Sequence, residues 1–351
     1  MTLILSNDDI AKLLTVPECM EALEDAYREL ANGRAVTGAG IDMQTPTSKA
    51  DHLYSLKCMD GILPNRSIAA VRIKSDIVTW PKVGNTKRRV KVPAAPGGRY
   101  VGLVLLFSSE TGEPLAIFPD GVMQRIRVGA TNGLGVKYMA RQNATSVGIL
   151  GSGWQAGTQL AAAAAARSIS KVLCFSPNAQ NRRIFAAEMT AALGIAVTAV
   201  NTPEEAVSGA DIVLCATSAI EPVFFERWVE PGMHISSIKG PEIEPTVFRR
   251  ADRIAVHSHD GTPQHAVTKG LDVPGKSGKH SYDVSSLPTL PELITGTAVG
   301  RSGDAQVTCF LNAVGLGFQF AAAGAVVYAK ARAAKLGHEL PTDWFTELEH
   351  P

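Results

Sequence analysis

The stretch from residue 145 to residue 178 constrains the fold of this chain more than any other. An apolar run ends in the turn Gly151-Ser-Gly-Trp-Gln-Ala156, an alanine-rich helical segment follows, and a second apolar run begins at Lys171. This order is typical of a dinucleotide-binding unit, because glycines let backbone N–H groups at a helix N-terminus approach a pyrophosphate. The alternative is an ordinary tight turn, but the flanking strand and helix favour cofactor binding. We therefore expect the cofactor to contact Gly151, Ser152, Gly153, Trp154, Gln155 and Ala156.

The end of the second apolar run indicates which dinucleotide binds. NAD sites usually carry an Asp or Glu here for the ribose 2′-hydroxyl, whereas NADP sites avoid that charge and supply Arg or small polar groups. The segment from Ser176 to Arg183 contains no acid. We therefore expect NADP, with NAD possible, and contacts from Ser176, Asn178 and Arg182. The alternative is that Arg182 and Arg183 only solvate the next helix.

Strands and helices continue to alternate after this unit. The patterns predict helices over 181–193, 203–207 and 245–250, and strands over 196–200, 211–216, 234–238 and 253–257. Such alternation indicates an α/β fold, a Rossmann-type doubly wound parallel sheet with right-handed crossovers. Ligands of these sheets bind at the carboxyl ends of the strands. We therefore add Thr217, Ser218 and Ile238 to the expected cofactor contacts.

The N-terminal third has a different character. Two helices are predicted over 10–14 and 16–31, and short apolar runs then alternate with Gly, Pro and Asn up to residue 120, which is typical of an antiparallel or mixed sheet. This pattern predicts an α+β domain. The basic stretch 82–99 within it is either a solvated hairpin or loop, or a flap that grips a carboxylate or a cofactor phosphate.

Two long helical patterns connect these regions. One covers residues 120–141 and would lead from the first domain into the strand at 145. The other covers 311–336 and would return to pack on the first domain or on a second subunit. We therefore expect one domain of residues 1–125 with 308–351, and a dinucleotide-binding domain of residues 126–307.

Charge and composition exclude several classes of partner. The 351 residues include 34 Lys and Arg against 33 Asp and Glu, a net charge of +1, which does not suggest nucleic acid or an anionic membrane surface. The N-terminus lacks the basic-then-apolar order of a signal peptide, so a cytoplasmic protein is expected.

Neither the cysteines nor the histidines suggest a metal site. The five cysteines have no metal-ligand spacing, and we expect them to be small hydrophobic residues of the core. His257, His259 and His265 likewise lack metal spacing, so no metal site is expected; a proton relay through one of them is the alternative.

Motifs spread over nearly the whole chain resemble one known family. They are Gly121-Val-Met-Gln-Arg-Ile-Arg127-Val-Gly-Ala130, the glycine turn, Ala216-Thr-Ser218 with Pro222, Pro231-Gly-Met-His-Ile235, and Leu290-x-Glu292 followed by Gly296 and Gly300-Arg301. In this order they resemble the ornithine cyclodeaminase/mu-crystallin family. The resemblance implies that residues 1–125 with 308–351 form a substrate-binding and dimerisation domain, and that a homodimer assembles through the N-terminal sheet and the C-terminal helix. It also implies hydride exchange between a nicotinamide and the α-carbon of a small amino or imino acid.

The resemblance assigns roles to several residues. Arg127 matches a family arginine and would contact the substrate carboxylate or the cofactor. A family lysine falls on Arg72, and Lys74 shares its face of the strand, so both are catalytic candidates. A second family arginine is missing at Ala39-Gly40-Ile41, and no Asp occurs at 239–242, where the cyclodeaminases carry one. Lys239 or Glu242 would then transfer the proton, although Glu242 could equally cap the following helix.

These departures bear on the reaction. A cyclodeaminase must oxidise, cyclise, expel ammonia and reduce again, whereas a single reduction requires fewer groups. We therefore expect an NAD(P)-dependent imine reductase or amino-acid dehydrogenase, whose side-chain specificity is set around Lys57, Met59 and the 82–99 stretch. The alternatives are an ornithine cyclodeaminase and a non-catalytic protein that binds a ligand together with the cofactor.

Overall fold

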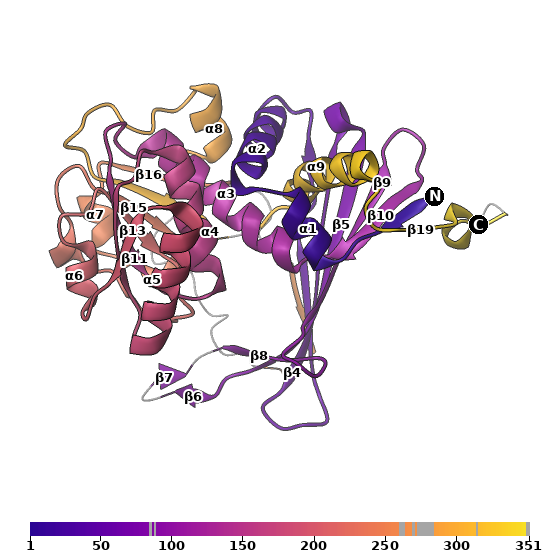
Figure 1. Ribbon diagram of the computed structural model, residues 1–351, viewed down its shortest axis with the longest axis horizontal. Coiled ribbons are helices and arrows are strands. Elements are labelled where there is room, and N and C mark those ends of the chain that lie inside the picture. Colours follow the sequence, from indigo (N-terminus) through magenta and orange to yellow (C-terminus); the bar gives the residue numbers. More distant parts are fainter. Residues whose placement is uncertain are drawn as a thin grey trace. The chain divides into compact units, whose positions relative to one another are not determined.

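The computed structural model describes residues 1–83, 86–87, 89–259, 264–268, 271, 284–313 and 315–348 (Figure 1). The chain forms two compact units. Unit 1 contains Met1–Arg127, Asp260–Pro274 and Gly315–Pro351, and unit 2 contains Val128–His259 and Gly275–Val314. The boundary near residue 127 falls inside helix α3 (Gly121–Met139), which confirms the helix predicted over 120–141.

Unit 1 is built on a mixed sheet with the strand order β17-β3-β4-β5-β9-β10-β1-β19. The pairs β1–β10 and β17–β3 are parallel and the other neighbours in this order are antiparallel. The strands are β1 (Thr2–Ile4), β3 (Ile41–Pro46), β4 (Leu53–Leu63), β5 (Ile68–Thr79), β9 (Val101–Ser108), β10 (Pro114–Pro119), β17 (Gln264–Val267) and β19 (His338–Leu340). Short strands β2 (Val36–Thr37) and β8 (Val90–Val92) pair with β4 and β5, and β6 (Lys82–Val83) pairs with β7 (Thr86–Lys87).

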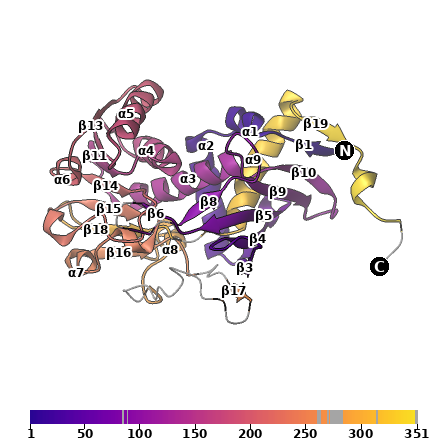
Figure 2. The same ribbon diagram turned by 90° about the horizontal axis from the view of Figure 1, so that it is seen from below.

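Helices cover one face of this sheet. Helices α1 (Asn7–Leu13), α2 (Val16–Ala31) and α9 (Phe318–Ala334) lie together on one side of the strands, as Figure 2 shows. Ser6 and Thr15 begin α1 and α2 with capping boxes, in which the side-chain oxygen accepts from the N3 backbone N–H. Along β5, buried and half-buried residues alternate from Ile68 to Thr79. The buried residues face the helices, so the other face of the sheet stays open within unit 1.

Unit 2 contains a parallel sheet with the strand order β13-β12-β11-β14-β15-β18-β16. Its strands are β11 (Ser146–Leu150), β12 (Lys171–Phe175), β13 (Ala196–Ala199), β14 (Ile212–Cys215), β15 (His234–Ser237), β16 (Arg253–Val256) and β18 (Thr308–Leu311). Its helices are α4 (Trp154–Ala166), α5 (Ala179–Leu193), α6 (Pro203–Val207), α7 (Val247–Arg250) and α8 (Leu290–Thr295). Helices α4 and α5 lie on one face and α7 on the other (Figure 2). The predicted doubly wound α/β fold is confirmed, and the strand order reverses between β11 and β14.

The 3-10 helices are short. They are η1 (Pro64–Arg66), η2 (Glu226–Trp228), η3 (Gly240–Glu242) and η4 (Thr342–Phe345). In the described part of the chain, no helix is long and apolar enough to cross a membrane.

The prediction of one helix over 311–336 is wrong at its start. Residues 308–311 form β18, which pairs with both β15 and β16, and α9 begins only at Phe318. A strand that is buried on both faces reads as a continuous apolar run, which periodicity cannot distinguish from a buried helix. Residues 308–314 therefore lie in unit 2, and residues 260–274 lie in unit 1, where β17 extends the sheet beside β3. Both assignments differ from the expected domain boundaries.

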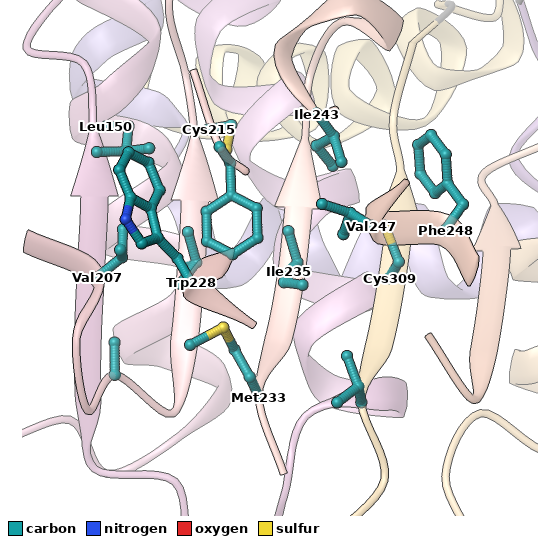
Figure 3. Close-up of a cluster of buried hydrophobic side chains, with 14 of the residues drawn as sticks. Leu150, Val207, Cys215, Trp228, Met233, Ile235, Ile243, Val247, Phe248 and Cys309 are labelled. Carbon is teal, nitrogen blue, oxygen red and sulfur yellow. The ribbon is translucent and has the colours of Figure 1, made fainter. Parts of the chain in front are cut away.

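The core of unit 2 contains side chains from neighbouring parallel strands and from the segments that follow them (Figure 3). The buried residues labelled there are Leu150, Val207, Cys215, Trp228, Met233, Ile235, Ile243, Val247, Phe248 and Cys309. Burial raises the pKa of the Cys215 and Cys309 thiols well above the ordinary value. These two cysteines are therefore inert core residues, as the sequence predicted.

Candidate active site

Two basic side chains on the helix-covered face of β5 meet one carboxylate. Arg72 and Lys74 are buried and share this face because they are two residues apart. The Asp120 carboxylate, directly after β10, lies 2.7 Å from Nη2 of Arg72 and 3.4 Å from Nζ of Lys74. A Cβ atom at Gly102 would lie 2.1 Å from Oδ1 of Asp120, so only glycine leaves room for this carboxylate. The two catalytic candidates of the strand are thus held together by Asp120.

Arg127 reaches the same region from the start of α3. It donates from Nη2 to Oε1 of Gln124 at 2.7 Å and from Nη1 to Oε1 of Gln319 at 2.8 Å. The ring of Phe320 lies 5.1 Å from Cζ of Arg127 and 5.7 Å from Cζ of Arg72, so both guanidinium groups contact one aromatic ring. Burial, and then the nearby Arg72, lower the pKa of Arg127 to about 10, which leaves the group charged at neutral pH.

Lys57 lies beside these cations on β4. The antiparallel register places Lys57 directly opposite Lys74 and Met59 directly opposite Arg72. Nζ of Lys57 is 3.2 Å from Oδ2 of Asp42 on β3. Burial, and then the charge of Arg89, lower the pKa of Lys57. The sulfur of Met59 is 3.9 Å from Nη1 of Arg72.

Part of the basic stretch 82–99 reaches the same face of the sheet. Residues 84, 85 and 88 lie outside the described residues. Residues 90–92 form β8, and Nζ of Lys91 is 2.7 Å from Oδ2 of the buried Asp76 on β5. Burial lowers the pKa of Lys91, and the charges of Lys74 and Arg72 lower it further. We use the term charged face for the set Asp42, Lys57, Arg72, Lys74, Asp76, Lys91, Asp120 and Arg127.

The structure thus brings together the sequence candidates Arg72, Lys74, Lys57, Met59 and Arg127. Sequence reasoning missed Asp120, although its place directly after an apolar strand could have drawn attention to it. It also missed Gln319 and Phe320, which lie 192 and 193 positions from Arg127 along the chain and leave no local signal.

The glycine turn of unit 2 has the geometry that a dinucleotide turn needs. Gly151 has φ +119, and a Cβ atom there would lie 2.3 Å from the carbonyl oxygen of Ala216. Gly153 is the N-cap of α4, and a Cβ atom there would meet nothing within 4 Å. Ala156 is fully buried, while Trp154 is 59% exposed. Ser152 and Gln155 are half-buried in the same turn. An anion can therefore approach the backbone at Gly153, and Gly151 is required by the fold itself.

The residues after β12 form hydrogen bonds within the protein. Oδ1 of Asn178 accepts from the N–H of Asn181 at 3.0 Å and so caps α5. Arg182 is buried and donates to the carbonyl oxygen of Ser176 at 3.1 Å and to Oδ1 of Asn201 at 2.9 Å. Arg182 therefore holds the turn after β12 in place, and of the two neighbouring arginines it is Arg183 that is exposed.

Glu242 connects the ends of β14 and β15. Its Oε1 accepts from the N–H and Oγ1 of Thr217 at 2.5 and 2.8 Å, and its Oε2 accepts from Oγ of Ser237 at 2.9 Å and the N–H of Lys239 at 3.2 Å. The residue is fully buried, and this burial raises the pKa of its carboxyl group. None of these hydrogen bonds goes to α7, so they do not make Glu242 the cap of that helix, and proton transfer by Glu242 would require them to open.

The other candidates at this edge of the sheet are more accessible. Ser218 is exposed, and Ile238 and Lys239 are half-buried. A Cβ atom at Gly151 would lie 3.4 Å from Cγ2 of Thr217, so the segment after β14 adjoins the glycine turn at the strand-order reversal. This is where a parallel sheet binds its ligands.

The structure offers no metal site among the residues it describes, where no group of three His, Cys, Asp or Glu side chains could hold an ion. His257 is buried and His259 is exposed. The side chain of His265 lies outside the described part of the chain.

Known proteins resemble this chain in sequence and in fold over nearly its whole length. A Delta(1)-pyrroline-2-carboxylate reductase of Bacillus cereus is 30% identical over 343 residues, which cover 96% of this chain and 99% of that protein. The structure of the Thermococcus litoralis Delta(1)-pyrroline-2-carboxylate reductase in complex with NADH and L-proline has a TM-score of 0.77 and 27% identity, and covers 97% of this chain and 100% of that one. An archaeal alanine dehydrogenase dimer with bound NAD has a TM-score of 0.76 and 26% identity over 97% and 99% of the two chains. The profile of one family matches residues 1–335, and the chain therefore belongs to the ornithine cyclodeaminase/mu-crystallin family.

Proposed function

We propose that this protein is an NAD(P)-dependent oxidoreductase that acts on a small amino or imino acid, as an imine reductase or amino-acid dehydrogenase. The observation that supports this most is the charged face of unit 1, where Arg72 and Lys74 lie buried against Asp120 and the buried Arg127 shares the Phe320 ring with Arg72. Buried cations require anionic or polar partners, and guanidinium groups bind carboxylates through paired hydrogen bonds. A substrate carboxylate supplies such a partner.

The residues of the charged face have different proposed roles in the reaction. Arg72 and Arg127, on the same Phe320 ring, bind the carboxylate and fix its orientation. Lys74 donates a proton to the substrate nitrogen, because an ammonium group can release a proton and a guanidinium cannot. The reduced nicotinamide supplies the hydride. Lys239 is the second candidate for proton transfer, since Glu242 is occupied by its own hydrogen bonds.

The cofactor is proposed to bind at the glycine turn and the neighbouring strand ends of unit 2. NADP is supported by the absence of an acid from Ser176 to Arg183, and Arg183 is the exposed cation there. NAD is the alternative, since the structures of the alanine dehydrogenase and of the Thermococcus reductase hold NAD and NADH.

Calorimetric titration with NADPH and NADH distinguishes an NADP site from an NAD site. Tighter NADPH binding that weakens in Arg183→Ala supports NADP, and tighter NADH binding contradicts it. Arg182→Ala is the structural control. It removes the hydrogen bonds to Ser176 and Asn201 and should lower the melting temperature.

The dimer is proposed to form through the open face of the unit 1 sheet. Exposed apolar side chains gather on it: Ile41, Met43, Ile62, Val101 and Leu103. Monomeric proteins seldom expose so continuous an apolar face, and the archaeal alanine dehydrogenase is a dimer. The predicted contribution of the C-terminal helix is less well supported, because α9 is largely buried against its own sheet.

Light scattering after size exclusion tests this interface. Leu103→Glu places a charge on the apolar face and should shift the protein from dimer to monomer. Ile184→Glu, at an exposed apolar residue of α5, is the matched control and should leave the mass unchanged. A Leu103→Glu protein that remains a dimer would argue against this face.

The reaction itself is tested by following NADPH or NADH oxidation with a panel of 2-oxo acids plus ammonium or methylamine. Oxidation that depends on both reactants supports the proposal. Release of ammonia from L-ornithine with no net change in the cofactor would identify a cyclodeaminase. Tight cofactor binding without either activity would identify a ligand-binding protein.

A further inference from the structure

Cations outnumber acids on the charged face of unit 1. Among the described residues it contains five cations (Lys57, Arg72, Lys74, Lys91 and Arg127) and three carboxylates (Asp42, Asp76 and Asp120), an excess of two positive charges. The whole chain carries only +1. The charge on this face is therefore a local feature and does not follow from a basic composition.

The register places like charges against each other. Lys57 and Lys74 are directly opposite on β4 and β5, an arrangement that destabilises a sheet unless an anion compensates it. Each lysine contacts a different acid, Lys57 with Asp42 and Lys74 with Asp120. Asp120 is also shared with Arg72. The acids of the chain therefore offset only part of this repulsion.

We propose that the substrate carries a second carboxylate, so that the reaction acts on a dicarboxylic amino or imino acid. This inference rests on the proposed function and specifies its substrate class. The first carboxylate binds between Arg72 and Arg127, and the second binds at Lys57, opposite Lys74. Residues 72 and 74 are separated by about 7 Å along the strand, a spacing that suits the two ends of a four- or five-carbon acid. A dianion matches the excess of two positive charges.

The first test compares substrates with the wild-type protein. Oxaloacetate or 2-oxoglutarate with ammonium should support NAD(P)H oxidation with a kcat/KM about 10- to 100-fold above that of pyruvate or 2-oxobutyrate, the range expected for one additional charge-assisted contact. Succinate and glutarate should likewise inhibit more tightly than propionate and butyrate. If monocarboxylates are used equally well, the inference is wrong and the proposed function stands. If no 2-oxo acid supports oxidation, the proposed function itself fails.

The second test changes the lysine. Lys57→Met should remove most of the dicarboxylate preference, measured as the ratio of kcat/KM for oxaloacetate to kcat/KM for pyruvate, and Lys57→Arg should keep this ratio because it keeps the charge. Lys12→Met, at an exposed lysine of α1, removes the same charge elsewhere in unit 1 and is the matched control. An unchanged preference in Lys57→Met overturns the assignment of Lys57. Should Lys57→Met fail to fold because Asp42 loses its ion pair, the wild-type inhibition series still decides the substrate class.

Discussion

Both units bury charged side chains, but the partners of these side chains differ. In unit 2, the half-buried Arg301 donates to the carbonyl oxygens of Met139 at 2.8 Å and Gln306 at 2.6 Å, and the buried Arg167 donates to those of Arg141 at 2.7 Å and Ala140 at 2.8 Å. Each guanidinium there satisfies backbone groups at the ends of helices and strands. In unit 1, the half-buried Lys57 of β4 and the buried Arg72 and Lys74 of β5 meet other charged side chains on one face of a sheet.

The difference shows that burial of a charge does not by itself identify a functional residue. A guanidinium that donates to fixed carbonyls has its hydrogen bonds satisfied by the fold and has little left for a ligand. Buried cations that outnumber the carboxylates beside them are stabilised when an anion binds among them. The residues to test for function are therefore those of the charged face, and the arginines of unit 2 are the structural reference.

The largest expected effect follows from replacing Arg127. Arg127→Met should lower kcat/KM for the imino acid by roughly 30- to 5,000-fold, because truncating one partner of a buried charge contact costs about 2–5 kcal/mol. Dinucleotide affinity should change by less than about twofold, within the scatter of such contacts far from a substitution. Arg301→Met is the comparison, and should lower the melting temperature because its carbonyl partners lose their donor. If Arg127→Met weakens dinucleotide binding as much as catalysis, Arg127 contacts the cofactor.

Substitutions at the two glycines of the turn should have different effects, one on dinucleotide affinity and the other on stability. Gly153→Ala meets no atom within 4 Å and should cost less than about 1 kcal/mol of stability, yet raise the dinucleotide Kd about 10- to 100-fold by blocking the approach of the pyrophosphate. Gly151→Ala should instead destabilise unit 2, because its Cβ would clash with the carbonyl oxygen of Ala216 and its φ is positive. Gly303→Ala, which also meets nothing within 4 Å, is the control. Unchanged dinucleotide affinity in Gly153→Ala would show that the turn does not bind the cofactor.

Structural features that depend on residues close together in the chain could be predicted from the sequence. The glycine turn, the alternation of strands and helices after it, and the long helix over 120–141 each depend on residues close together in the chain. The shared face of Arg72 and Lys74 followed from the two-residue period of a strand.

Features that depend on distant partners were not predictable. Strand β18 is apolar because it lies between β15 and β16, and no local pattern distinguishes it from the start of a helix. Gln319 and Phe320 contact Arg127 only because α9 returns to the sheet of unit 1. Arg182 was expected to contact the cofactor from its position after β12, but only the packed structure shows its bond to the Ser176 carbonyl.

The smallest expected effect concerns a buried histidine of unit 2. His234 is fully buried with Nδ1 at 2.9 Å from Oγ1 of Thr308, and burial, followed by the charges of Arg301 and Arg167, lowers its pKa from 6.5 to about 3. The folded protein therefore keeps His234 neutral, whereas the unfolded chain takes up the proton as the pH falls below about 6.5. This contribution to stability is complete above that pH and is lost progressively as the pH falls toward 3.

At pH 5.5 this loss should be about 1.4 kcal/mol relative to pH 7.5. His234→Gln should show a smaller loss between the two pH values by about that amount, measured by urea unfolding at each pH. Comparing the two pH values within each variant removes any constant cost of the substitution itself. His338→Gln, at an exposed histidine of β19, should behave like the wild type. An equal pH dependence in His234→Gln and wild type would mean that His234 is not the group in unit 2 that senses acid.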